Sequence, residues 1–180
     1  SQGTVAKLAD GFYYIKNVNA QKYLQVKDNT GKNVQNVELG TGSGVAGQKW
    51  YLTNTSDGYI TLKSALGDFM IDIANGADED GANAQIYAAY SGNAQKFQLS
   101  PSSNGTYIIT TKASNGTKAL EAYGKGTADG TNVCQYTING NTNQQWIFEK
   151  IDETVKPSAA PSAAPSVAPS IAPSVAPSSS

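Results

Sequence analysis

The sequence predicts an all-β fold assembled from three copies of one unit. A glutamine, one further residue and a large aromatic residue recur at almost equal spacing, in the segments 48–50, 95–97 and 144–146. Other residues recur at fixed distances before each closing aromatic. An asparagine stands fourteen places before it, at Asn36, Asn83 and Asn132. A period of about fifty residues indicates one supersecondary unit used three times.

Each unit begins with an aromatic and β-branched run that follows an Asp-Gly or Asn-Gly pair. The pairs are Asp10-Gly11, Asp57-Gly58 and Asn104-Gly105. Such pairs favour tight reversals between strands. Three more short strands are expected in every unit, without helical periodicity. Four strands in each of three units predict a β-trefoil with pseudo-threefold symmetry, a barrel of six strands capped by three hairpins.

The apolar residues of the three units are expected to form threefold layers of one core, because a single unit cannot bury its own apolar face. One layer comprises Leu24, Ile71 and Leu120. The other comprises the closing aromatics Trp50, Phe97 and Trp146.

The composition predicts one domain followed by a linker. Residues 1–152 have ordinary globular composition and the size of a single core. The repeats span approximately residues 10–56, 57–103 and 104–152. A proline then stands at every fourth residue between 157 and 177, among serine and small apolar residues. Such a segment cannot bury enough surface to offset its ordering entropy, so residues 153–180 are predicted to be a disordered Pro/Ser/Ala linker to another module.

The charged residues argue against several functions. All thirteen basic residues are lysine, fourteen residues are acidic, and histidine is absent. A near-neutral chain without arginine is poorly suited to nucleic-acid recognition. The missing histidine removes the commonest general base and metal ligand. The one cysteine, Cys134, allows no internal disulfide and is expected to be buried in a strand. No cofactor, metal or membrane span is predicted.

The repeats resemble the ricin-B-type lectin domain, which in bacterial enzymes is the family 13 carbohydrate-binding module. The resemblance covers residues 10–152 three times over. It implies one sugar pocket in each repeat, built from four elements. These are an acid after a Leu or Ile, a glutamine thirteen places on, an aromatic two further, and an Asn-Gln pair before the closing aromatic.

The resemblance implies at most two pockets on this chain, of which the middle one should be the stronger. The middle repeat is the better preserved, with carbohydrate-binding residues Asp72, Gln85, Tyr87, Asn93 and Gln95, where Asn93 adjoins the Ala94 that replaces the expected asparagine. The third repeat carries Glu121, Tyr136, Asn143 and Gln144, with Cys134 in place of the glutamine. The first repeat has Gln25 in place of the acid and Gly40 in place of the aromatic, so its site should be lost.

Two groups of these residues allow alternative interpretations. The glutamines before the closing aromatics either satisfy backbone groups where strands splay apart or contact the sugar. Tyr90 and Asn139 stand three places after the pocket aromatics, so they either touch a second sugar unit or decorate the surface.

The residue types suit a sugar on physical grounds. A carboxylate accepts charge-assisted hydrogen bonds from neighbouring hydroxyls, each worth roughly 1.5–3 kcal/mol. A tyrosine face covers the C–H patch of the ring. Amides both donate and accept, as hydroxyls do.

The sequence therefore predicts a non-catalytic carbohydrate-binding module that targets an attached polysaccharide-degrading enzyme to galactose-containing glycan. Xylan and arabinan are the alternative ligands. A protein-binding or inhibitor β-trefoil and a structural spacer are the alternatives of a different class. Glycoside hydrolysis is not predicted, because it commonly needs two carboxyl groups about 5–10 Å apart across one bond. Asp72 and Glu121 occupy equivalent places in different repeats, so threefold symmetry should put them on separate faces. The acidic segment 78–81 has two interpretations: a calcium-binding loop, since oxygen-rich loops bind calcium, or a turn that recurs at Asp129-Gly130. The turn is the favoured interpretation. The protein is expected to be monomeric, secreted and bacterial, with its leader outside this sequence.

Overall fold

Twelve strands follow one another within residues 4–152, which are the residues that the computed structural model describes. The strands are β1 (Gly11–Asn17), β2 (Tyr23–Val26), β3 (Gln35–Gly40), β4 (Trp50–Asn54), β5 (Ile60–Ser64), β6 (Phe69–Ile73), β7 (Ala84–Ala88), β8 (Phe97–Pro101), β9 (Tyr107–Thr111), β10 (Lys118–Ala122), β11 (Val133–Thr137) and β12 (Trp146–Lys150). The predicted all-β class and the four strands per repeat are confirmed. The predicted linker at 153–180 lies outside the described residues.

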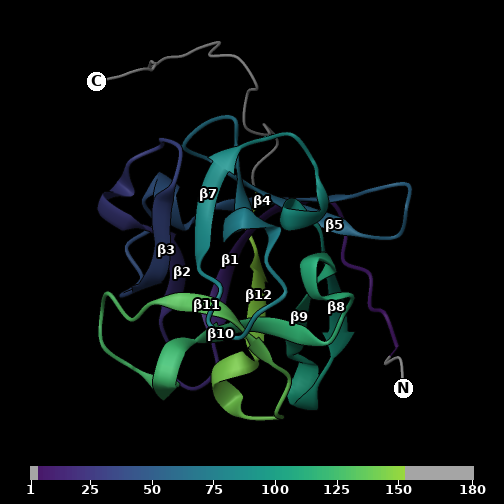
Figure 1. Cartoon of the computed structure of the whole chain (residues 1–180). Helices are drawn as coiled ribbons and strands as arrows, with labels where there is room; N and C mark the ends of the chain where they lie inside the picture. The colour runs from purple at the N-terminus through teal and green to yellow at the C-terminus, as the bar shows by residue number, and fades with distance from the viewer. Residues whose placement is uncertain (1–3, 153–180) are drawn as a thin grey trace.

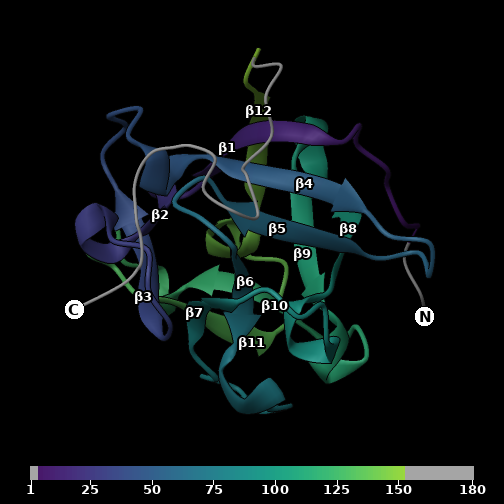
Figure 2. The same cartoon turned by 90° about the horizontal axis from the view of Figure 1, so that it is seen from above.

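Six of the strands close into a barrel. Strand β1 pairs with β4, β4 with β5, β5 with β8, β8 with β9, β9 with β12 and β12 with β1, all antiparallel. The other six form the hairpins β2–β3, β6–β7 and β10–β11. In Figure 2 the barrel strands β1, β4, β5 and β9 lie above the hairpin strands β6, β7, β10 and β11. This is the predicted β-trefoil.

The side chains predicted to form the threefold core layers are fully buried. They are Leu24, Ile71 and Leu120, with Trp50, Phe97 and Trp146. The indole N–H of Trp50 donates to the carbonyl of Leu24 at 3.0 Å, and that of Trp146 donates to Leu120 at 3.1 Å. Each closing tryptophan is therefore tied to the strand that supplies the other layer.

The three Asp-Gly or Asn-Gly pairs do not all form hairpin turns. Gly58 and Gly105 have positive φ in the turns that join β4 to β5 and β8 to β9, as expected. Gly11 is instead the first residue of β1, which opens the barrel. The Asp10 carboxylate accepts hydrogen bonds from the backbone N–H and the amide of Asn54, at 2.9 and 2.7 Å.

Eight short 3₁₀ turns, which the sequence did not predict, connect the strands. Three follow the first hairpin strands: η1 (Lys27–Asn29), η3 (Ala74–Gly76) and η7 (Tyr123–Lys125). Three precede the closing aromatics: η2 (Ala46–Gln48), η4 (Asn93–Gln95) and η8 (Thr142–Gln144). The remaining two are η5 (Ser103–Gly105) and η6 (Lys112–Ser114). None of the helical turns in residues 4–152 has the length and apolarity needed to cross a membrane.

The recurring asparagines form a closed ring where the three hairpins meet. The amide of Asn36 donates to the side-chain oxygen of Asn132, Asn132 donates to Asn83, and Asn83 donates to Asn36. The three distances are 2.8, 2.8 and 2.7 Å, in the same order. Each amide thus donates once and accepts once within the ring. Figure 1 shows the strands β3, β7 and β11 arranged around this centre.

The strands β3, β7 and β11 also contact one another in pairs, and we call each contact a seam. Backbone pairing across the seams joins Asn36 to Gln85, Asn83 to Cys134 and Asn132 to Glu38. A side-chain oxygen from the loop before β3, β7 or β11 caps each seam. It accepts a hydrogen bond from a backbone N–H of the neighbouring repeat. The caps are Asn33 to Ala88, Asp80 to Thr137 and Asp129 to Thr41, at 2.8, 2.7 and 2.9 Å.

Removing one amide of the ring should destabilise the fold. Asn83→Ala breaks two hydrogen bonds and leaves two partly buried amide groups unpaired, so the free energy of unfolding should fall by about 2 kcal/mol. Asn36→Ala should have the same effect, because the ring is symmetric. The double variant loses only one further bond, so its loss should be smaller than the sum. Urea denaturation of the four proteins measures this coupling, and additive losses would show that the ring does not act as a unit.

Candidate functional site

The carboxylate of Asp72 lies buried on the β6–β7 hairpin, directly opposite Gln85. Its Oδ1 accepts a hydrogen bond from the Gln85 amide at 3.2 Å, and its Oδ2 accepts one from the Gln95 amide at 3.0 Å. Two amide donors from different elements therefore fix the orientation of the carboxylate. The structure brings together three of the residues predicted for the middle site.

Gln95 holds both the carboxylate and the loop above it. Its side-chain oxygen accepts from the backbone N–H groups of Tyr90 and Ser91, both at 2.9 Å. Its amide donates to Asp72 and to the carbonyl of Ala88 at 3.1 Å. Gln95 is fully buried and its hydrogen-bonding groups are engaged, which favours the structural interpretation of the repeated glutamines. Gln95 would therefore affect a ligand indirectly, by holding the Asp72 carboxylate in its orientation.

The two tyrosines predicted for the middle site are exposed on the same hairpin as Asp72 and in the loop that follows it. Tyr87 is 38% exposed at the end of β7, and Tyr90 is 60% exposed in the following loop. The Tyr90 ring lies against Gly92, where a Cβ atom would come within 2.2 Å of it. Asn93 is exposed at the start of η4, whereas the buried Ala94 occupies the place equivalent to Asn143. Asn93 is therefore separate from the buried cluster around Asp72.

Burial controls the ionisation of this site. Burial raises the pKa of the Asp72 carboxyl above its ordinary value of 3.8, and the hydrogen bonds from Gln95 and Gln85 oppose that rise. Burial also raises the pKa of Tyr90, and the charge of Asp72 adds to the effect. A buried acceptor on the same hairpin as a partly exposed ring is the result.

The third repeat has the same arrangement on the β10–β11 hairpin. The amide of Gln144 donates to Glu121 Oε1 and to the carbonyl of Thr137, both at 3.0 Å, and its oxygen accepts from the Asn139 N–H at 3.0 Å. Burial raises the pKa of Glu121, the Gln144 bond opposes that rise, and the charge of Asp80 adds to it. Tyr136 is 37% exposed at the equivalent place to Tyr87.

Asn143 has a buried acceptor without a partner. Its amide donates to the carbonyl of Ala122 at 2.9 Å, but its side-chain oxygen is buried and meets no hydrogen-bond donor among the described residues. Such an orphaned acceptor requires an explanation, because leaving one unpaired costs about 1–3 kcal/mol. Asn143 borders an open pocket, so a ligand hydroxyl could supply the missing donor.

That pocket has a volume of about 260 Å³. Its lining comprises Glu121, Tyr123, Gly124, Lys125, Tyr136, Asn139, Asn141 and Asn143. Sequence reasoning missed Tyr123, which is 59% exposed on η7 and faces the pocket together with Tyr136. The available signal was an aromatic two places after the acid, where the middle repeat has Ala74.

In the first repeat, side chains of the repeat itself fill the space that corresponds to the sugar pocket. The Gln25 amide donates to Glu38 at 2.8 Å, and its oxygen accepts from the Gln48 amide at 3.0 Å. The Gln25 side chain occupies the space beside Gly40, since a Cβ atom there would lie 2.0 Å from it. This geometry agrees with the expected loss of the site. The predicted ranking of the middle site above the third stays a prediction.

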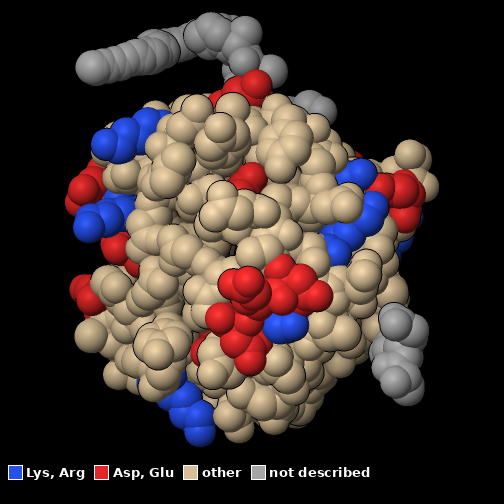
Figure 3. All heavy atoms as spheres, viewed as in Figure 1, with Lys and Arg blue, Asp and Glu red and all other residues tan. Residues whose placement is uncertain are grey.

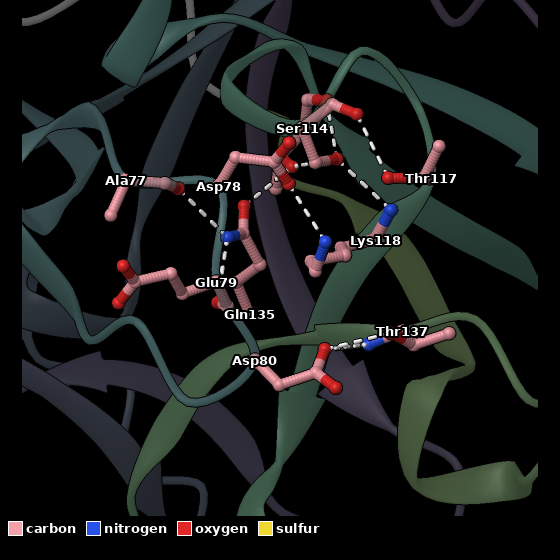
Figure 4. A network of polar contacts seen from close by, with 10 residues as sticks. Ala77, Asp78, Glu79, Asp80, Ser114, Thr117, Lys118, Gln135 and Thr137 are labelled. Carbon is pink, nitrogen blue, oxygen red and sulfur yellow. Dashed lines mark hydrogen bonds and ion pairs between the residues drawn. The ribbon is translucent and has the colours of Figure 1, made fainter.

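The acidic run at 78–80 is engaged in the seam between the second and third repeats. Figure 3 shows acidic side chains gathered around a lysine on this face, and Figure 4 shows the contacts. Asp78 pairs with Lys118 at 2.7 Å, and Asp80 caps the seam at Thr137. Gln135, fully buried, donates to the carbonyls of Ala77 and Glu79. Within residues 4–152 no group of three or more His, Cys, Asp or Glu residues is placed to hold a metal ion.

Cys134 is buried in β11, as expected, with 1% of its surface exposed. Burial raises the pKa of its thiol to about 12, and the charges of Glu121 and Asp80 contribute. A thiol with this pKa is not a nucleophile at neutral pH. The residue fills the space that Gln85 occupies in the middle repeat.

Comparison with known proteins agrees with the β-trefoil fold. A family model described as ricin-type beta-trefoil lectin domain-like matches residues 4–87, 46–136 and 93–158. The structure is similar to that of ThreeFoil, a designed 3-fold symmetric protein. The two share 32% identity and a TM-score of 0.75, over 79% of this chain and all of that one.

Two further relatives are much longer than the matching region. Flavastacin from Elizabethkingia meningoseptica is 36% identical over 75 residues, which are 42% of this chain and 17% of flavastacin. An exo-beta-1,3-galactanase from Clostridium thermocellum is 24% identical with a TM-score of 0.74, over 82% of this chain and 31% of that one. The galactanase shares the fold, and in both proteins the similar region is a minor part of the whole.

Replacing the buried glutamines should separate their structural role from their role at the site. Gln95→Ala and Gln48→Ala each remove a buried amide that holds a loop, so each should lower the free energy of unfolding by about 2–3 kcal/mol. Only Gln95→Ala also frees the Asp72 carboxylate. Urea denaturation should therefore give similar losses, while heteronuclear NMR should show changed Tyr87 and Tyr90 signals for Gln95→Ala alone. Disturbance of those signals by Gln48→Ala would contradict the local role.

Proposed function

The chain belongs to the ricin-type beta-trefoil lectin domain-like family, and from this premise we propose that it binds carbohydrate without catalysis, at the second and third repeats. The supporting observation is the arrangement that these two repeats share and the first lacks. In each, one hairpin carries both a buried carboxylate and a tyrosine that is more than one-third exposed. A glutamine from the closing signature holds each carboxylate in place.

The chemistry of these groups fits a sugar better than a peptide or a phosphate. Asp72 and Glu121 are acceptors held in fixed orientations, which suits hydroxyl donors and repels anions. The exposed rings of Tyr87 and Tyr136 offer flat faces for the C–H patch of a sugar ring. In the third repeat the unpaired oxygen of Asn143 adds a further acceptor at the pocket wall.

Two pockets on one rigid body suit a repetitive polymer. A shallow pocket that takes one sugar unit buries little area, so each site alone should bind weakly. When one site is occupied on a polysaccharide, the second meets its ligand at a high effective concentration. The proposed role is therefore attachment to polysaccharide, with the strength coming from both sites together.

We extend the proposal to the setting of the domain. Its target is a galactose-containing glycan such as galactan, as the family resemblance implies, with xylan and arabinan as the other candidates. It serves an attached polysaccharide-degrading enzyme, consistent with relatives in which the similar region is a small part of a longer protein. The proposed location is outside a bacterial cell, and the proposed form is a monomer.

Substitutions at the three equivalent positions test the number of sites. Asp72→Ala and Glu121→Ala should each remove one of two binding events, and the double variant should remove both, because the carboxylate supplies the charge-assisted bonds. The middle repeat keeps Gln85, so Asp72→Ala should cause the larger loss. Gln25→Ala is the matched control and should leave binding almost unchanged. Calorimetry and affinity electrophoresis against galactan, xylan, arabinan and cellulose measure the result. A dominant effect of Gln25→Ala would overturn the assignment.

The affinity of the middle site should depend on pH. Ligand hydroxyls prefer the ionised carboxylate, and burial raises the Asp72 pKa. Affinity should therefore fall on acidification with a midpoint above 3.8, the ordinary value for the group.

The free energy of unfolding should change with pH in the opposite direction. Ionisation of Asp72 destabilises the fold increasingly as pH rises from the unfolded to the folded pKa, and this cost is absent below both. Calorimetric titrations of the Glu121→Ala protein, with circular dichroism to check folding, measure the midpoint. Constant affinity down to pH 3.8 would contradict a carboxylate acceptor.

A further inference from the structure

Val34 adopts a backbone conformation that its side chain disfavours. Its φ is +67°, in the left-handed region, where a β-branched residue is a genuine outlier because its Cβ crowds the backbone. The side chain is also 63% exposed, so its apolar surface gains little from packing. Both features oppose valine at this place. Strained residues of this kind concentrate at ligand-binding positions.

The symmetry of the fold shows what the position itself requires. The equivalent residues of the second and third repeats are Gly81 and Gly130, with φ values of +88° and +86°. Both glycines donate backbone hydrogen bonds across their seams, Gly81 to the carbonyl of Gln135 and Gly130 to that of Leu39, each at 2.8 Å. Val34 makes the same bond to Ile86 at 2.9 Å. The seam therefore forms equally well without a side chain.

The hydrogen bonds of the first seam place Val34 near Tyr87, a residue of the predicted middle site. Gln35 pairs with Ile86 and Asn36 with Gln85, and Val34, in the turn just before β3, donates its backbone N–H to the carbonyl of Ile86, the residue before Tyr87. The cap from Asn33 to the N–H of Ala88 continues this register. An exposed valine therefore lies near an exposed tyrosine at the boundary of two repeats.

The other two seams lack this combination. In the second seam Gly81 lies near Tyr136, so the third pocket has its tyrosine but no neighbouring side chain at this place. In the third seam Gly130 lies near Gly40, beside the closed pocket of the first repeat. The unfavourable valine thus occurs only where it borders the best-preserved predicted site.

We propose that Val34 is a specificity-determining residue of the middle site. Its methyl groups contact the C–H face of a second sugar unit when the first unit lies against Tyr87. The ligand of the middle site is then an oligosaccharide segment of a neutral glycan, whereas the third site takes single sugar units. This inference rests on the proposed function and deepens it, because it assigns different ligand lengths to the two sites.

Val34→Gly tests the assignment, since glycine fits the backbone and removes only the side chain. The Glu121→Ala background leaves the middle site alone. There, the affinity for β-1,3-linked galactotriose should fall about fivefold to tenfold, as expected for losing a partly buried valine. The affinity for galactose should change less than twofold. The melting temperature should not fall, because relief of strain offsets the greater freedom of glycine in the unfolded chain. Val45→Gly, at another exposed valine (39%), is the control and should leave both affinities unchanged.

The reciprocal variant, Gly81→Val, tests whether a valine at the equivalent position gives the third site the same preference for a longer ligand. A Cβ atom at Gly81 would meet nothing within 4 Å, so Gly81→Val has room for its side chain. In the Asp72→Ala background it should raise the ratio of galactotriose to galactose affinity at the third site, while lowering the melting temperature. An unchanged ratio in Val34→Gly, or a clear loss of its stability, would overturn the inference while galactose binding still supported the proposed function. A wild-type protein that bound neither sugar would overturn this inference, together with the galactan ligand.

Discussion

The closed ring of Asn36, Asn83 and Asn132 is the constraint on which the rest of the structure depends. A hairpin from one repeat is marginal alone, and the ring joins all three hairpins at one point with every amide both donating and accepting. The ring also sets the register of the seams, because each asparagine is itself paired across one. Once the register is set, β3, β7 and β11 lie against one another in fixed pairs.

The buried glutamines link folding to binding. Gln48, Gln95 and Gln144 each hold the loop before their 3₁₀ turn, and each donates to the residue at the acid position. The first repeat shows that this bond survives when the acid becomes Gln25. The glutamine is thus required by the fold whether or not a site exists. It explains why the closing signature recurs three times although only two repeats carry a buried carboxylate and an exposed tyrosine on one hairpin.

Much of the fold could be predicted from residue spacing, and part of the site could not. Equal spacing of Trp50, Phe97 and Trp146 was sufficient for the strand count, the core layers and the barrel, since those depend on local pattern and burial. The asparagines were visible at fixed spacing, but their ring depends on three segments meeting in space. The orphaned oxygen of Asn143 likewise depends on which donors surround it. Tyr123 was missed because the resemblance assigns no pocket residue to that place.

Comparison among the repeats separates what the fold requires from what one repeat adds. At Val34, Gly81 and Gly130 the backbone has nearly the same conformation and makes the same bond, so the seam selects for glycine. A valine there opposes local backbone preference and gains little burial. Glycine at this place would relieve the strain and keep the backbone bond, as Gly81 and Gly130 show. The presence of valine near Tyr87, at the one seam that borders the fullest set of pocket residues, is explained by contact with something outside the chain.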